Sequence, residues 1–208
     1  MKFKEIIFSL NFDKLEKWLE TKKLTNEQFN FALNFSLKNN KKKLLNLLLK
    51  YAHNYKIDDF IFSFLIETNK EEILKKLCKD KIYKEYSFLI LKSIDKNLKF
   101  AKYFKEMITN NFELLLYNPE FLNLIEYTIK NRFVDINKID ARSFTDLFSY
   151  PKTLKSIIKY FDDKQIDLLL NNAIFQNNQP AISLLLEYQA NKNKTDIKDK
   201  IKAKPKRR

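Results

Sequence analysis

Two segments of the chain align with each other without a gap: ALNFSLKNNKKKLLNLLLKYAHN (residues 32–54) and LLNNAIFQNNQPAISLLLEYQAN (residues 169–191). They share eight identical positions in 23. Apolar residues recur in them at i, i+3 and i+4, the spacing that places side chains on one face of a helix. An Asn-containing polar turn divides each segment. The pattern predicts a helix-turn-helix unit that occurs more than once in the chain.

Further apolar doublets fall in the same phase and indicate about seven degenerate units averaging just under 30 residues. A pair of short helices cannot bury its apolar face alone, so neighbouring pairs must stack. We therefore expect an all-α fold, a solenoid of about seven stacked helix-turn-helix repeats, with the apolar run at residues 60–66 as a buried first helix. The doublets are Trp18 with Leu19, Leu48 with Leu49, Leu77 with Cys78, Tyr103 with Phe104, Leu124 with Ile125, Ile157 with Ile158, and Leu185 with Leu186.

Three of the four prolines share one place in the unit. Pro119, Pro151 and Pro180 each lie two or three residues before the apolar stripe of an expected second helix. Proline is favoured in the first turn of a helix, where its missing N–H is not needed. The prolines therefore predict where three second helices begin.

The chain contains no glycine, and this absence excludes several classes of site. Phosphate-binding loops, dinucleotide-binding loops and nucleophile elbows all need backbone that only glycine adopts cheaply. A helix that ends in a tight turn must then use another residue in the left-handed region, and Asn is the usual substitute. We expect Asn40, Asn69 and Asn177 to adopt this conformation.

The remaining composition gives no support for catalysis. One Cys and one His, Cys78 and His53, fall short of a zinc site and cannot form an internal disulfide. Neighbouring acids such as Asp162 and Asp163 point different ways on a helix and do not converge on a metal. We assign no catalytic, cofactor-binding or metal-ligating residue, and expect no small-molecule substrate. His53 is interpreted as a solvated turn residue, and Trp18 and Cys78 as core residues.

The segments LLLEYQANKN (residues 184–193) and LLLKYAHN (residues 47–54) resemble the end of an ankyrin repeat, where an apolar pair precedes a short polar turn. The chain departs from that family because no unit has the threonine-proline-leucine-histidine opening, no Gly follows the apolar pair, and most units are shorter. The shortening implies that the family's projecting β-hairpin fingers are stunted or absent. A generic α-solenoid stays open as the structural alternative.

The resemblance implies a non-enzymatic scaffold that binds another protein. Together with the composition, it suits a viral or parasite protein that acts on host proteins. Exposed lysines at comparable places in adjacent units, Lys38, Lys41 and Lys70, would form a basic face for an acidic partner. Codon drift in an AT-rich genome explains these lysines equally well, since Lys outnumbers Arg 36 to 4.

The charge is unevenly distributed. Lys and Arg number 40 against 26 Asp and Glu, giving +14, and residues 192–208 hold nine of the cations with two Asp, giving +7. We expect residues 1–191 to form the solenoid and residues 192–208 to form a disordered basic tail. The cluster Lys204, Lys206, Arg207 and Arg208 is also suited to nuclear import or to phosphate binding, so a nucleic-acid-associated protein is the alternative function.

No signal peptide or membrane-spanning segment is recognisable. Glu5 and Asp13 interrupt the N-terminal apolar stretch, and no apolar run approaches the roughly 20 residues that cross a bilayer. We expect a cytoplasmic or nuclear protein, in the host cell if it is viral or parasitic, with no membrane partner.

Overall fold

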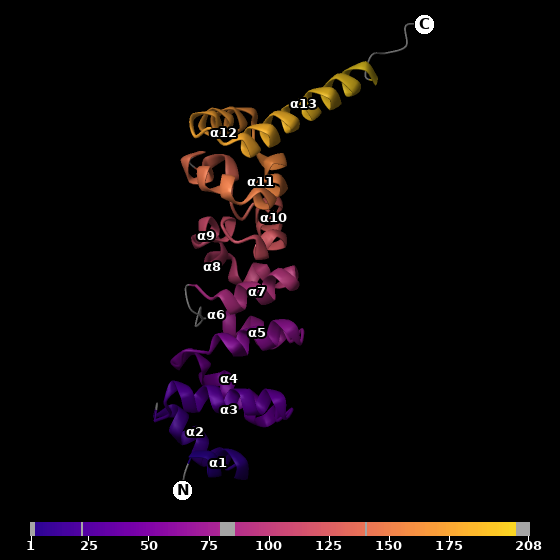
Figure 1. Ribbon diagram of the computed structural model, residues 1–208. Helices are drawn as coiled ribbons and strands as arrows, with labels where there is room; N and C mark the ends of the chain where they lie inside the picture. Colours follow the sequence, from indigo (N-terminus) through magenta and orange to yellow (C-terminus); the bar gives the residue numbers. More distant parts are fainter. Residues whose placement is uncertain (1–2, 22, 80–85, 140, 203–208) are drawn as a thin grey trace, which may run out of the picture. The chain divides into compact units, whose positions relative to one another are not determined.

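The computed structural model describes residues 3–21, 23–79, 86–139 and 141–202 (Figure 1). These residues form α-helices and short 3-10 helices joined by turns, and none of them is in a strand. The all-α prediction is confirmed. The chain divides into two compact units, residues 1–108 and residues 109–208.

Helices that are neighbours in sequence pack in pairs in unit 1: α1 on α2, α3 on α4, α5 on α6, and α7 on the 3-10 helix η2. We call the two members of a pair the first and the second helix. The bounds are α1 (Phe3–Ser9), α2 (Phe12–Glu20), α3 (Asn26–Lys38), α4 (Lys42–Tyr51), η1 (Ala52–Asn54), α5 (Asp59–Glu67), α6 (Glu71–Lys79), α7 (Phe88–Lys96) and η2 (Leu98–Phe104). Helix α8 (Lys105–Asn110) contains the division between the units.

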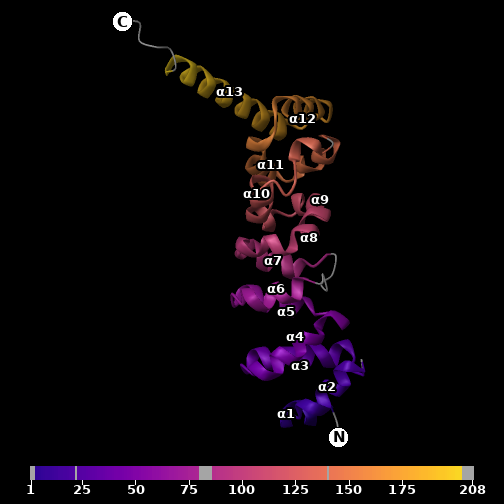
Figure 2. The ribbon, with the colours of Figure 1, turned by 180° about the vertical axis from the view of Figure 1, so that it is seen from behind.

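Adjacent pairs of unit 1 also pack on each other. Helix α2 contacts α4, α5 contacts α7, and α6 contacts η2. The first helices α3, α5 and α7 follow one another along the same side of the unit in both views (Figures 1 and 2). In the core, Phe62 of α5 meets the edge of Phe104 of η2, and both rings are fully buried.

Unit 2 repeats the arrangement with α9 on α10, η5 on α11, and α12 on α13. Between pairs, α10 contacts α11, η5 contacts α12, and α11 contacts α13. The bounds are α9 (Phe112–Leu116), η3 (Pro119–Phe121), α10 (Leu122–Lys130), η4 (Ile136–Lys138), η5 (Ala141–Ser149), α11 (Pro151–Ile157), η6 (Ile158–Tyr160), α12 (Asp163–Phe175) and α13 (Gln179–Lys202).

The predicted helix boundaries agree with these elements. Pro119 and Pro151 are the first residues of η3 and α11, and Pro180 is the second residue of α13. Residues 60–66 lie within α5, whose side chains are buried on more than one face. The aligned segments at 32–54 and 169–191 each contain a helix, a turn and a second helix, as expected.

The turn chemistry was also predicted correctly. Asn40, Asn69 and Asn177 have φ of 52°, 60° and 52°, and each follows a first helix. The next residue donates its N–H to the carbonyl five residues earlier, as from Lys41 to Ser36 at 2.9 Å, which satisfies the open end of the helix. Leu10 and Arg132 have φ of 52° and 56° and make the same turn, although their side chains are poorly suited to it.

The side-chain amides of Asn30 and Asn137 form hydrogen bonds with the segments that lead from one helix pair to the next. Asn30 donates its Nδ2 to the carbonyl of Lys56 at 2.8 Å, and its Oδ1 accepts from the N–H of Asp58 at 3.1 Å. In unit 2, Asn137 makes the same two bonds, to Tyr160 at 3.3 Å and from Asp162 at 2.9 Å. Asp58 and Asp162 are the residues that precede α5 and α12.

The boundary expected after residue 191 coincides with no helix end, because α13 continues through it to Lys202. Gln189 donates to Asp167 at 3.0 Å and the ammonium of Lys192 pairs with Asp163, so the start of the expected tail is fastened to α12. No proline occurs between Pro180 and Pro205 to stop the helix. Residues 203–208 lie outside the described residues.

Replacing Arg132 with glycine tests the cost of the left-handed turn. We expect Arg132→Gly to raise the free energy of unfolding by roughly 1 kcal/mol, because glycine adopts a positive φ without the clash that other residues suffer. Urea denaturation provides the measurement. The matched control is Asn131→Gly, where φ is −91° and the side chain donates to Tyr127 at 2.9 Å. This control should lose stability; equal gains from both variants would contradict the assignment.

Candidate binding face

The first helices carry most of the exposed large apolar side chains among the described residues. Apart from Tyr86, which precedes α7, and Leu186 of α13, every such residue is on a first helix. They are Phe8 on α1, Phe31 on α3, Phe60 on α5, Phe88 and Leu89 on α7, Leu114 on α9, and Leu168, Ile174 and Phe175 on α12. Their exposed apolar side chains make the first helices the candidate contact surface in each unit.

These residues were not predicted from the sequence, because the apolar periodicity marks the buried stripe of each helix and the exposed residues lie beside that stripe. A signal was present in α5, where apolar residues occupy six of the seven positions from 60 to 66 and cannot all face the core. Phe62 is fully buried while Phe60 is 52% exposed.

On second helices, polar side chains form contacts between adjacent helix pairs. Glu16 of α2 accepts from Lys50 Nζ at 2.9 Å and from the Tyr51 hydroxyl at 3.3 Å, both at the end of α4. The Lys50 ammonium also lies 4.9 Å from the centre of the Tyr51 ring. The side chains thus join the second helices of adjacent pairs.

The same contact recurs twice. Glu71 of α6 accepts from the Tyr103 hydroxyl at 2.8 Å and forms an ion pair with Lys102 at 3.1 Å. In unit 2, Glu126 of α10 accepts from the hydroxyl of Ser156 and pairs with Lys159 at 3.1 Å. A tyrosine follows the lysine each time, and each ammonium lies over that ring. We call these three clusters the carboxylate–lysine contacts.

The contacts lower the pKa of all three carboxyls. The principal causes are the hydrogen bonds from Lys50 to Glu16, from Tyr103 to Glu71 and from Ser156 to Glu126, to which the nearby ammonium charges add. A carboxyl with a lowered pKa stabilises the fold above its ordinary pKa. That stabilisation is lost as the pH falls through the lowered value.

The predicted basic residues occupy two different places. Lys41 and Lys70 each follow a left-handed Asn at the turn between helices, so they are equivalent, and both are exposed. Lys38 is instead the last residue of α3, where its Nζ lies 5.6 Å from the centre of the Phe60 ring. The structure therefore separates Lys38 from the other two. The cluster of Lys204, Lys206, Arg207 and Arg208 lies outside the described residues.

Lys41 borders a hollow of about 470 Å³ in unit 1. It is lined by Leu10, Phe12 and residues 40–44, which include three consecutive lysines at the start of α4. No acid is in the first turn of that helix. Because the N-terminus of a helix is already the positive end of its dipole, the lysines concentrate positive potential there.

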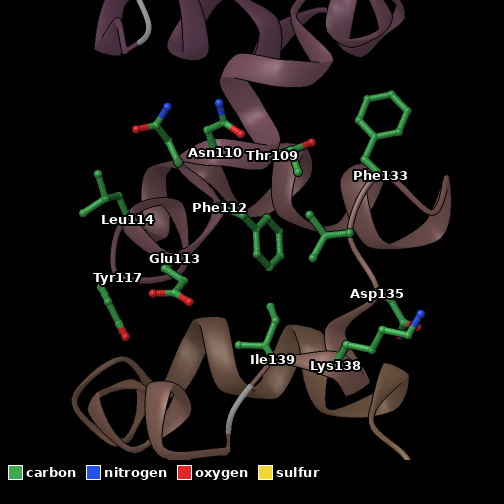
Figure 3. Close-up of a pocket in the computed structure, with 12 residues that line it drawn as sticks. Thr109, Asn110, Phe112, Glu113, Leu114, Tyr117, Phe133, Asp135, Lys138 and Ile139 are labelled. Carbon is green, nitrogen blue, oxygen red and sulfur yellow. The ribbon is translucent and has the colours of Figure 1, made fainter.

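A second hollow, of about 510 Å³, lies in unit 2 between α9 and residues 133–139. Phe112 and Ile139 point toward it from opposite sides (Figure 3). Lys138 and Asp135 pair at 3.6 Å, and the Tyr117 hydroxyl donates to the carbonyl of Ser143 at 2.6 Å. Its lining includes neither His nor Cys, and the facing side chains of Phe112 and Ile139 suit an apolar group.

Individual roles were predicted for three residues, His53, Cys78 and Trp18, and each can be compared with its place in the structure. His53 is exposed in η1, as expected. Cys78 is buried in α6, and its burial raises the pKa of the thiol to about 12. Trp18 is half-buried, with Lys14 Nζ 5.9 Å from its ring, so it is only partly the core residue that was expected.

Within the described part of the chain, no three His, Cys, Asp or Glu side chains gather so as to hold a metal ion. No described helix combines the length and apolar character that spanning a bilayer requires. Comparison with protein-family models, with curated proteins and with solved structures finds no match to this chain.

Replacing Glu71 with glutamine tests the carboxylate–lysine contacts. We expect Glu71→Gln to lower the free energy of unfolding at pH 7 and to weaken the loss of stability below pH 4.5, the ordinary pKa of the carboxyl. Glu72→Gln is the matched control, since Glu72 is exposed in the same first turn of α6. Urea denaturation at several pH values compares them. Identical pH profiles for the two variants would show that the contact contributes nothing.

Proposed function

We propose that the chain is a non-enzymatic protein-binding scaffold built from ankyrin-like helical repeats. Its first helices would form the binding surface, and its second helices would hold the repeats together. The observation that carries the proposal is the gathering of exposed apolar side chains on first helices. Their exposure costs solvation free energy that burial under a partner would recover, at about 25 cal/mol per Å² of apolar surface.

The arrangement of pairs supports the repeat assignment. Each first helix is followed by a turn and a second helix. The paired hydrogen bonds of Asn30 and Asn137 and the carboxylate–lysine contacts recur between pairs. A chain in which each repeat contacts its neighbours presents an extended surface, and such surfaces bind other proteins through side chains on successive repeats. The resemblance of residues 47–54 and 184–193 to ankyrin repeats supports the choice of family.

Each unit has an exposed phenylalanine on a first helix that is a candidate for contact with a partner. In unit 1, Phe60 of α5 is 52% exposed, and in unit 2, Phe175 of α12 is 92% exposed. Phe175 therefore buries little of its surface within the chain. Its burial against a partner would contribute strongly, because aromatic side chains dominate interface energetics.

A photo-crosslinker placed on each kind of helix tests the proposal. Benzoylphenylalanine would replace Phe60 or Phe175 on first helices. In the matched controls it would replace Lys75 or Lys155, which are exposed on the second helices α6 and α11. We expect discrete crosslinked protein adducts in cells from the first-helix positions, several-fold stronger than from the second-helix positions. Adducts of equal yield from all four positions, or none from Phe60 and Phe175, would refute the assignment of the face.

A further inference from the structure

Lysines are unevenly divided between the two kinds of helix in unit 1. The second helices α2, α4, α6 and η2 hold ten lysines, whereas the first helices α1, α3, α5 and α7 hold four. Each group holds five Asp and Glu, so the net charges are +5 and −1. A drift of codons toward lysine would enrich both groups alike, so it does not account for this difference.

The exposed side of α6 carries three of these lysines. Leu74, Leu77 and Cys78 are buried and lie together on one side of the helix. At about 100° per residue, the three lysines fall on the opposite side. They are Lys75, Lys76 and Lys79, and all are exposed. Three ammonium groups therefore reach solvent from one side of a short helix.

The 3-10 helix η2, which packs on α6, adds two lysines beside this side. Residues i and i+3 of a 3-10 helix lie on the same side, so Lys99 and Lys102 project together. Their ammonium groups reach Glu71 of α6 at 3.7 and 3.1 Å, and Lys75 lies one helical turn after Glu71. The lysines of the two helices are therefore neighbours. We call Lys75, Lys76, Lys79, Lys99 and Lys102 the lysine cluster.

The acids of these two helices do not cancel the charge of the lysine cluster. Glu71 is shared by two of the five lysines, and Glu72 is exposed beside the others. Both acids together leave a net charge of +3 on α6 and η2. Packed helices are about 8–10 Å apart, within about one Debye length at 0.1 M salt. The potentials of the lysines on the two helices therefore add.

The lysine cluster offers charge without the apolar contacts that proteins and membranes use. Within α6 and η2 no large apolar side chain is exposed, whereas Phe60 and Phe88 on first helices are. Protein interfaces depend on buried aromatic anchors, and membrane-bound helices insert apolar side chains. The backbone of a nucleic acid needs neither, because lysines that contact its phosphates release condensed counterions.

The aromatic rings of η2 favour a duplex over a single strand. Bases of a single strand stack on exposed rings, but Phe100 and Phe104 are fully buried. Tyr103 is half-buried, its hydroxyl donates to Glu71 at 2.8 Å, and the Lys102 ammonium lies 4.9 Å from the centre of its ring. A duplex also presents the denser charge, with one phosphate per about 1.7 Å of its axis.

We infer that the lysine cluster binds the phosphate backbone of a double-stranded nucleic acid. DNA and RNA duplexes share this backbone chemistry, and the experiment below distinguishes them. The inference concerns α6 and η2 and does not depend on the protein-binding function proposed for the first helices.

Binding of fluorescent duplexes to the full chain, measured by anisotropy at several salt concentrations, tests the inference. The probes are a DNA duplex and an RNA duplex of one sequence of about 20 base pairs. In the variant Lys75→Gln with Lys79→Gln, two phosphate contacts are lost. We expect binding to DNA, RNA or both to weaken about tenfold at 0.1 M salt, and the slope of log K against log salt to become shallower by about 1.8. An unchanged slope with both duplexes would overturn the inference.

The matched control makes the same change of net charge on first helices. Lys4→Gln with Lys38→Gln replaces two exposed lysines of α1 and α3, and should alter binding by no more than about twofold. Conversely, Glu72→Gln removes the exposed acid beside the lysine cluster and should tighten binding about twofold. Urea denaturation verifies that all variants are folded. Equal losses in the two double variants would mean that only net charge or another segment, such as residues 192–208, binds the duplex, and the assignment would fail.

Three other probes separate the inference from its alternatives. Tighter binding of oligothymidine than of either duplex would refute the preference for a duplex. Polyglutamate that competed as well as a duplex of equal charge would show that any polyanion suffices. Phosphatidylcholine vesicles containing phosphatidylserine that bound the chain when the duplexes did not, and released it in the Lys75 and Lys79 double variant, would make the lysine cluster a membrane site. Crosslinking at Phe60 is judged separately, since none of these outcomes concerns the first helices.

Discussion

Short helices cannot bury their apolar sides alone, and every other feature of this protein depends on that constraint. Most of its α-helices have between 5 and 13 residues, which is too few for stability as isolated helices in water. Each helix therefore packs on its partner in the pair, and within each unit most pairs also pack on a neighbour. Fully buried residues such as Leu33, Leu65 and Leu124 belong to this shared interior.

First and second helices differ in the contacts that their remaining side chains make. On second helices, carboxylates and lysines face one another across adjacent pairs, so these polar side chains are already engaged. On first helices, Ser63 and Ser93 meet in the interior while Phe60 and Phe88 lie outside. The polar interior contact fixes which side of α5 faces α7. Polar hydroxyls inside and aromatic rings outside agree with the binding surface that we propose for the first helices.

Much of the fold could be predicted from the sequence because its rules are local. Asn40, Asn69 and the prolines mark turns and helix starts through backbone preferences that need no knowledge of the neighbours. Leu10 and Arg132 escaped notice since neither residue type favours a positive φ. The carboxylate–lysine contacts were not predicted either, because they join residues about 30 positions apart. The recurrence of Lys followed by Tyr at residues 50, 102 and 159 was nevertheless visible.

A disulfide between α5 and α7 tests most directly whether successive first helices of unit 1 lie side by side in chain order. In the variant Ser63→Cys with Ser93→Cys, mild oxidation should form an internal disulfide in the native protein, because the two hydroxyls are 2.6 Å apart. Cys78 is buried and stays a thiol under these conditions. The pair Ser9→Cys with Ser93→Cys should form none. Failure of the first pair to close, or equal closure of both pairs, would contradict the account.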